Sequence, residues 1–91
     1  MEITTRLSGD ELFVLLTITN RTQQSQQYDC MLFAPGGRQY QRRQVVIPAE
    51  TTVKRLFPWR DAAELVGQKM LLRAVEQNGD RVLNQLVDVT P

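Results

Sequence analysis

The sequence contains no histidine, one cysteine and only two serines, Ser8 and Ser25. Without histidine, the chain lacks the commonest general base and the commonest metal ligand of proteins. Neither a Ser-His-Asp triad nor a Cys-His nucleophile can therefore be assembled. The single cysteine, Cys30, also excludes a disulfide within the chain, and its place in an apolar run is typical of a small buried side chain. We expect a protein with no catalytic activity, no metal and no other cofactor.

Long apolar segments are missing as well. The longest run, "LFVLLTI" from Leu12 to Ile18, falls well short of the ~18 residues that a membrane-spanning helix needs. It also lacks the basic leader and the small-residue cleavage site of a signal peptide. Hydrophobic residues make up 42% of the chain and charged residues 23%, which is the composition of an ordinary globular domain. We therefore expect one domain over residues 1–91 and no membrane insertion by this segment.

The sequence does contain apolar and polar residues that alternate with a period of two, the pattern of β-strands. The strongest segment, 12–19, places Leu12, Val14, Leu16 and Ile18 on one face. Turn-forming residues separate such segments about every 8–12 residues, which is typical of an all-β sandwich or a small barrel. We expect about seven strands, over residues 2–7, 12–19, 28–34, 38–47, 51–57, 69–77 and 81–89.

Two turn motifs lie between these strands. Asp61 and Glu64 match a capping box, which predicts about one helical turn near residues 61–67 that ends at Gly67. Asn78-Gly79 favours a type I′ turn, so the strands on either side of it should be antiparallel neighbours.

Two further motifs suggest ligand or modification chemistry. "PGGR" at residues 35–38 lacks the four-residue glycine spacing and the Lys-Ser/Thr pair of a phosphate-binding loop. We interpret it as the bend between two strands. "NRT" at residues 20–22 fits the acceptor pattern for N-glycosylation, which matters only in a eukaryotic secretory setting.

The net charge of +1 conceals an uneven distribution. Residues 36–60 carry a local net charge of +5, and the remaining residues sum to −4. A basic groove with aromatic planes is how single-stranded nucleic acids are held. The other interpretation is a solvated edge strand over 38–47 whose charges prevent pairing with other sheets. Strand alternation would place Arg38 and Arg42 on the face opposite Arg43.

Three motifs together resemble an immunoglobulin-like or fibronectin-III-like sandwich of the kind attached to bacterial exported proteins. "LFVLLTITNRT" resembles the second strand and the loop after it, and "VVIPAETT" resembles the bend before the fifth strand. "LVGQKMLLRAVEQNGDRVLN" resembles the last hairpin. The chain departs from antibody domains because it has no paired cysteines, no tryptophan in the third strand and no tyrosine among residues 70–75.

This resemblance implies a non-catalytic accessory or adhesion-type module, cut from a longer bacterial protein that is exported, periplasmic or attached to the cell surface. Its partner would be another protein or a neighbouring domain of the same chain. We expect the contact surface on the edge strand 38–45 and on a loop around Trp59, although Trp59 could equally cap the core. The candidate binding residues are Arg38, Tyr40, Arg42, Arg43, Trp59 and Arg60.

Two alternatives stay open at this point. One is an OB-fold barrel that binds single-stranded nucleic acid, with phosphates on Arg38, Arg42, Arg43 and Lys54 and bases stacked on Tyr40 and Trp59. The other is a homo-oligomer formed by pairing of edge strands, which Arg42 and Arg43 argue against.

Overall fold

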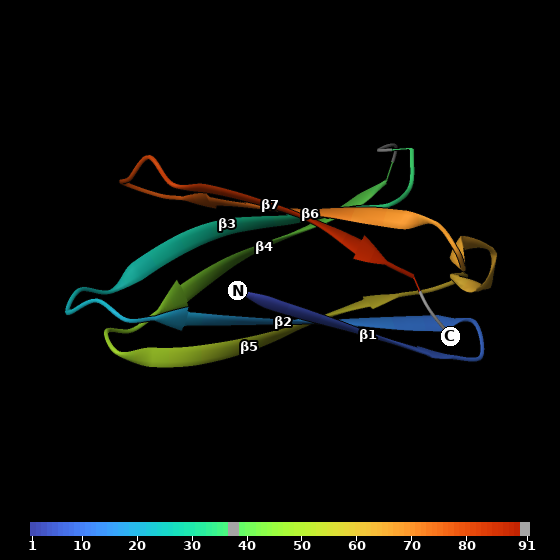
Figure 1. Cartoon of the computed structure of the whole chain (residues 1–91), viewed down its shortest axis with the longest axis horizontal. Coiled ribbons are helices and arrows are strands. Elements are labelled where there is room, and N and C mark those ends of the chain that lie inside the picture. Colours follow the sequence, from blue (N-terminus) through green and yellow to red (C-terminus); the bar gives the residue numbers. More distant parts are fainter. Residues whose placement is uncertain (37–38, 90–91) are drawn as a thin grey trace.

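A computed structural model describes residues 1–36 and 39–89, which form seven strands in two layers (Figure 1). One sheet has the order β1-β2-β5 and the other β4-β3-β6-β7, and all neighbouring strands in both are antiparallel. The predicted β-sandwich is confirmed. The strands are β1 (Glu2–Ser8), β2 (Glu11–Asn20), β3 (Gln26–Phe33), β4 (Tyr40–Ile47), β5 (Thr51–Trp59), β6 (Lys69–Glu76) and β7 (Val82–Asp88).

The two sheets are separate layers rather than one closed barrel. Within the described ranges, each strand pairs only with strands of its own sheet. The strands β4 and β5 follow each other in the chain yet lie at the edges of different sheets. The molecule measures 42 × 22 × 16 Å along its principal axes. This arrangement differs from the OB barrel that was the alternative fold.

The core fills the space between the layers, as the period-two pattern predicts. In β2 the residues Leu12, Val14, Leu16 and Ile18 are all at most 4% exposed, while Phe13 and Leu15 point outward and are half-buried. The facing sheet contributes the even-numbered residues of β3 and β6. The largest fully buried side chains on that side are Tyr28, Leu32, Met70 and Leu72.

The predicted helical turn is present, but its capping box is not. A 3₁₀ helix, η1, spans Ala63–Leu65 and begins after Ala62, with no side chain capping its start. Asp61 has a left-handed backbone (φ 53°), which turns the chain sharply before the helix. Ala62 is fully buried, and its N–H donates to the carbonyl of Asp10 at 2.8 Å. Packing of Ala62 thus fixes the helix start. No helix in the described ranges is long and apolar enough to cross a membrane.

The hairpin of β6 and β7 forms as predicted, with a different turn. Asn78 has a positive φ of 63°, but Gly79 does not, so the turn is not of type I′. The hairpin closes with the N–H of Glu76 on the carbonyl of Arg81 at 2.9 Å. The N–H of Gln77 bonds instead to the carbonyl of Gln27, at the start of β3, at 2.8 Å. This tertiary bond widens the loop beyond two residues.

Asn20, the last residue of β2, organises the end of the sandwich away from η1 and is 1% exposed (Figure 1). Its Nδ2 donates to the carbonyls of Gln24 at 2.7 Å and Ile47 at 3.0 Å, and its Oδ1 accepts from both the N–H and the hydroxyl of Thr22. The amide therefore ties the loop after β2 to the end of β4. A side chain enclosed in this way is not presented for glycosylation.

Candidate functional site

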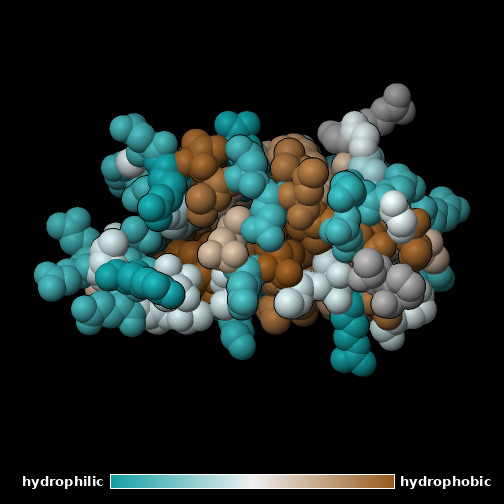
Figure 2. Space-filling model, viewed as in Figure 1, coloured by the Kyte–Doolittle hydropathy of each residue, from teal (hydrophilic) through white to brown (hydrophobic). Residues whose placement is uncertain are grey.

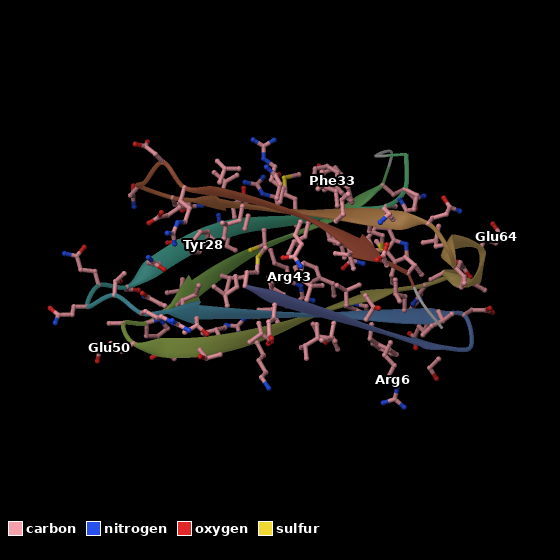
Figure 3. The ribbon with its side chains drawn as sticks, viewed as in Figure 1. Arg6, Tyr28, Phe33, Arg43, Glu50 and Glu64 are labelled. Atoms are coloured by element: carbon pink, nitrogen blue, oxygen red, sulfur yellow. The ribbon has the colours of Figure 1, made fainter. Side chains whose placement is uncertain are left out.

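The structure divides the sequence-predicted binding residues among different surfaces. Tyr40 and Arg42 lie on the outer face of β4, with Tyr40 55% exposed. Arg43 points the other way, toward β5, as strand alternation predicts. Figure 3 shows Arg43 and Tyr28 between the layers and Phe33 on the outer side of the four-stranded sheet. Arg38 lies outside the described residues.

Trp59 differs from the expectation of an exposed loop residue. It is the last residue of β5, pairs with Leu12 of β2 and is only 8% exposed. The strand continues through Pro58 because β5 is an edge strand, where the missing N–H of proline need not face a neighbour. Trp59 therefore caps the core. The exposed Arg60 follows it, beside an open hollow of about 400 Å³ that Pro35 and Gln39 also line.

The outer face of the four-stranded sheet carries a continuous row of apolar side chains. The strand registers place Phe33 beside Tyr40 of β4 and Leu71 of β6, and Leu71 beside Leu86 of β7. The rings of Tyr40 and Phe33 are 5.7 Å apart between centres. We call Tyr40, Phe33, Leu71 and Leu86 the apolar row. It crosses all four strands and ends at Leu86, which is 62% exposed.

A second row beside it is mixed in polarity. The same registers align Met31 with Arg42 of β4 and Arg73 of β6, and Arg73 with Asn84 of β7. An open depression of about 400 Å³ spans both rows, between the Pro35 turn and Leu86. Cations thus border the apolar row without interrupting it.

These cations differ in how they are neutralised. Arg42 binds Asp29 through two contacts of 2.8 Å, Nε to Oδ1 and a terminal nitrogen to Oδ2. The hydrogen bond and the charge of Asp29 raise the pKa of Arg42 above its ordinary value. Lys69 reaches Asp88 at 2.9 Å. Arg73 is exposed, and among the described residues it forms no ion pair.

The inward side of β4 is polar where it faces β5. The guanidinium carbon of Arg43 lies 5.6 Å from the centre of the Phe57 ring, within the range of a cation–π contact. The side-chain amide of Gln41 donates to the carbonyl of Pro58. These two residues close the gap between the sheets along this side. Lys54 faces outward from the other sheet, so the basic residues of 36–60 do not line one groove.

Cys30 behaves as a structural residue. It is fully buried between Arg43 of β4 and Ala74 of β6 in the strand pairing. Burial, and secondarily the charge of Asp29, raises the pKa of its thiol to about 11. The thiol is therefore protonated at neutral pH and a poor nucleophile. Among the described residues, no three or more Cys, Asp or Glu side chains are placed to hold a metal ion.

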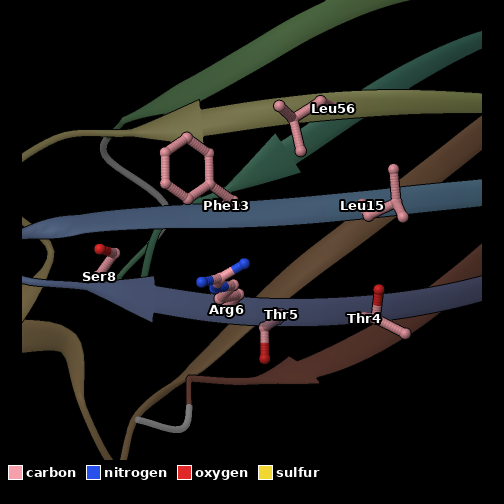
Figure 4. Close-up of a pocket in the computed structure, with 7 residues that line it drawn as sticks. All are labelled: Thr4, Thr5, Arg6, Ser8, Phe13, Leu15 and Leu56. Carbon is pink, nitrogen blue, oxygen red and sulfur yellow. The ribbon is translucent and has the colours of Figure 1, made fainter.

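The outer face of the three-stranded sheet has its own depression, of about 530 Å³ (Figure 4). Its apolar lining is Phe13, Leu15 and Leu56, and Arg6 lies at its rim. Leu56 is the one large apolar residue of that face that is strongly exposed, at 43%, within the described part of the chain. The four-stranded face has four such residues, namely Tyr40, Val46, Val82 and Leu86. The apolar row is therefore the stronger candidate.

Of the residues on this face, Tyr40 and Arg42 were named as candidates from the sequence, but not Phe33, Leu71 or Leu86, which lie in segments that were expected to be ordinary strands. The available signal was "CMLF" at residues 30–33, apolar on both strand faces. Such a run indicates a central strand but does not say whether its second face is covered. No protein-family model matches the sequence, and a search of curated proteins finds no significant match.

Proposed function

We propose that this chain is a non-catalytic, immunoglobulin-like interaction module of a larger protein that is exported or attached to the cell surface. The observation that carries the proposal is the apolar row on the outer face of the four-stranded sheet. Contiguous exposed apolar side chains with a polar rim are typical of protein-binding surfaces. A flat sheet face can bind another protein without any movement of its own backbone.

The strand arrangement supports the immunoglobulin-like part of the proposal. Two antiparallel sheets of three and four strands pack around one core, and the chain passes between the sheets after β2, β4 and β5. Immunoglobulin-like sandwiches share this two-layer architecture and these crossing connections. The same fold hosts many functions, so the choice among them rests on the surface.

The surface also indicates the chemistry of the partner. The apolar row requires aliphatic or aromatic side chains, and Arg73 beside it has no carboxylate partner among the described residues. A partner that places a carboxylate over Arg73 would form a charge-assisted hydrogen bond. We therefore propose a protein segment, from another chain or a neighbouring domain, that combines apolar side chains with at least one acidic residue.

A selection from a displayed library of random peptides tests this function. The full chain is immobilised, and enriched peptides are measured against the wild type, Tyr40→Ser and Leu56→Ser. Both substituted side chains are strongly exposed, at 55% and 43%, but they lie on opposite sheets. We expect enriched peptides to be acidic and apolar and to bind Tyr40→Ser at least about ten-fold more weakly, because a large aromatic contact is lost.

Leu56→Ser is the matched control and should bind the same peptides as the wild type does. Both variants should unfold at nearly the wild-type temperature, since neither side chain is in the core. The proposed function is wrong if no related peptides are enriched, or if the enriched peptides depend on Leu56 and not on Tyr40.

A further inference from the structure

The free edge of β7 is open to pairing with another strand. In antiparallel pairs, residues alternate between those that exchange backbone hydrogen bonds and those that do not. The bond from Glu76 N–H to the Arg81 carbonyl sets this alternation for β6 and β7. Odd-numbered residues of β7 therefore bond to β6, and Val82, Asn84 and Leu86 direct their N–H and C=O groups away from the sheet.

One end of this edge is already occupied. The hydroxyl of Thr5, on β1, donates to the carbonyl of Asp88 at 3.3 Å. This contact limits the open segment to residues 82–86, whose midpoint is Asn84. Within the described part of the chain, that segment pairs with β6 on one side and with no strand on its outward side.

The side chains of the open segment do not protect it. Natural proteins block free edges with charged residues, proline or inward-pointing charges. Residues 82–86 contain none of these, and Val82 and Leu86 are 44% and 62% exposed. Figure 2, which views the side of the molecule on which β7 lies, shows hydrophobic side chains exposed along it.

The segment is also complementary to itself. When two copies of residues 82–86 run antiparallel about a two-fold axis at Asn84, Val82 of each copy lies opposite Leu86 of the other. Cross-strand apolar pairs of this kind stabilise sheets. The two Asn84 side chains meet at the axis, where each amide can both donate and accept. A closed, two-fold interface is the commonest form of homo-oligomer.

We propose that two copies of this chain associate through β7, residues 82–86, to form a continuous eight-stranded sheet with the two-fold axis at Asn84. In this pairing each apolar row, which ends at Leu86, continues onto Val82 of the other copy. This inference is independent of the proposed partner on the sheet face. A monomeric variant should still bind the selected peptides through Tyr40.

Sedimentation velocity of the full chain, from about 10 µM to about 1 mM, tests the association, because a small interface gives dissociation constants in or below this range. The wild type should pass from monomer to dimer. Val82→Lys should weaken dimerisation at least about ten-fold, since a charge replaces an apolar pair. Val46→Lys is the control, because Val46 is 49% exposed on the same face but lies on β4. It should dimerise as the wild type does.

A charge exchange at the axis tests the register. Asn84→Asp and Asn84→Lys should each be monomeric over the same range, because like charges then face each other across the axis. An equimolar mixture of the two should restore a dimer. The proposal is overturned by a wild type that stays monomeric at 1 mM, by equal effects of Val82→Lys and Val46→Lys, or by a mixture that does not associate.

Discussion

The two outer strands of the four-stranded sheet, β4 and β7, differ in the side chains that surround their unpaired backbone groups. On β4, Arg42 is held against Asp29 of the neighbouring strand, and Arg43 turns inward over Phe57. An inward-pointing charge at an edge disfavours addition of another strand, because pairing would desolvate it. The side-chain amide of Gln41 further ties β4 to β5. This edge is closed by its own side chains.

On β7, the only charged residue is Asp88, and it lies at the end of the strand with Lys69 beside it. The rest of the strand has no charged residue and presents Val82 and Leu86 to solvent. Both edges belong to the same sheet and to strands of similar length, so the sheet itself does not explain the difference. Whether each edge can pair with another strand therefore depends on a few side chains. Substituting those side chains should change it.

The largest expected effect comes from proline in adjacent positions of β7. Gln85 lies opposite Leu72 of β6 and directs its N–H into the sheet, whereas Asn84 directs its N–H outward. Gln85→Pro should lower the free energy of unfolding by about 3 kcal/mol, because it removes a ladder bond and leaves a carbonyl of β6 unpaired. Asn84→Pro should cost about 1 kcal/mol or less, since an edge tolerates proline on its free side.

Urea denaturation of both variants measures this difference, and sedimentation velocity provides the second measurement. Asn84→Pro should remain folded and yet be monomeric, because the outward N–H at the two-fold axis is gone. Equal losses of stability in the two variants would contradict the assignment of outward and inward groups on β7.

The next prediction concerns a variant whose copies should also pair through β4. The double substitution Arg42→Val with Arg43→Val removes the charged side chains of β4, so that its edge resembles residues 82–86 of β7. With both edges able to pair, each copy can join two others, and the assembly does not close. We expect light scattering and sedimentation to show species much larger than a dimer.

Arg73→Val is the control for this experiment. It adds an apolar side chain to the same face, but on the central strand β6, which has strands on both sides. It should therefore sediment like the wild type. A double variant at β4 that forms no more than a dimer would show that its arginines do not protect that edge.

The fold could be predicted closely from the sequence because one feature, the alternation of apolar and polar residues, indicates both the strands and the face of each strand that is buried. Residues 12–18 alternate strictly, and their apolar face is the buried face. Predictions were wrong where a distant contact decides the local geometry. Ala62 rather than Asp61 precedes the 3₁₀ helix because Ala62 packs in the core and bonds to Asp10.

The candidate surface was harder to predict than the fold. Tyr40 and Arg42 were expected on a polar edge strand, and both lie on its outer face. The apolar row depends on the registers of β3, β6 and β7, which bring Phe33, Leu71 and Leu86 into line. Strand periodicity gives the face of a residue but not its neighbours on other strands.

The smallest expected effect compares the ion pairs that attach the two outer strands. Arg42 and Asp29 join β4 to β3 through two parallel contacts, whereas Lys69 and Asp88 join β6 to β7 through a single contact. The Asp88 side chain is 66% exposed and that of Asp29 is 19% exposed. Paired contacts of arginine with a carboxylate are stronger and more directional than a single lysine contact.

Asp29→Asn should therefore lower the thermal unfolding temperature by a few degrees, and Asp88→Asn should change it less. Both effects should shrink at high salt, because exposed ion pairs are screened. Calorimetry at low and high ionic strength measures both variants. An equal or larger loss for Asp88→Asn would mean that β7, despite its unprotected edge, is held as firmly by its terminal pair as β4 is. The two edges would then differ only in their ability to pair with other strands and not in how tightly each is fixed to the sheet.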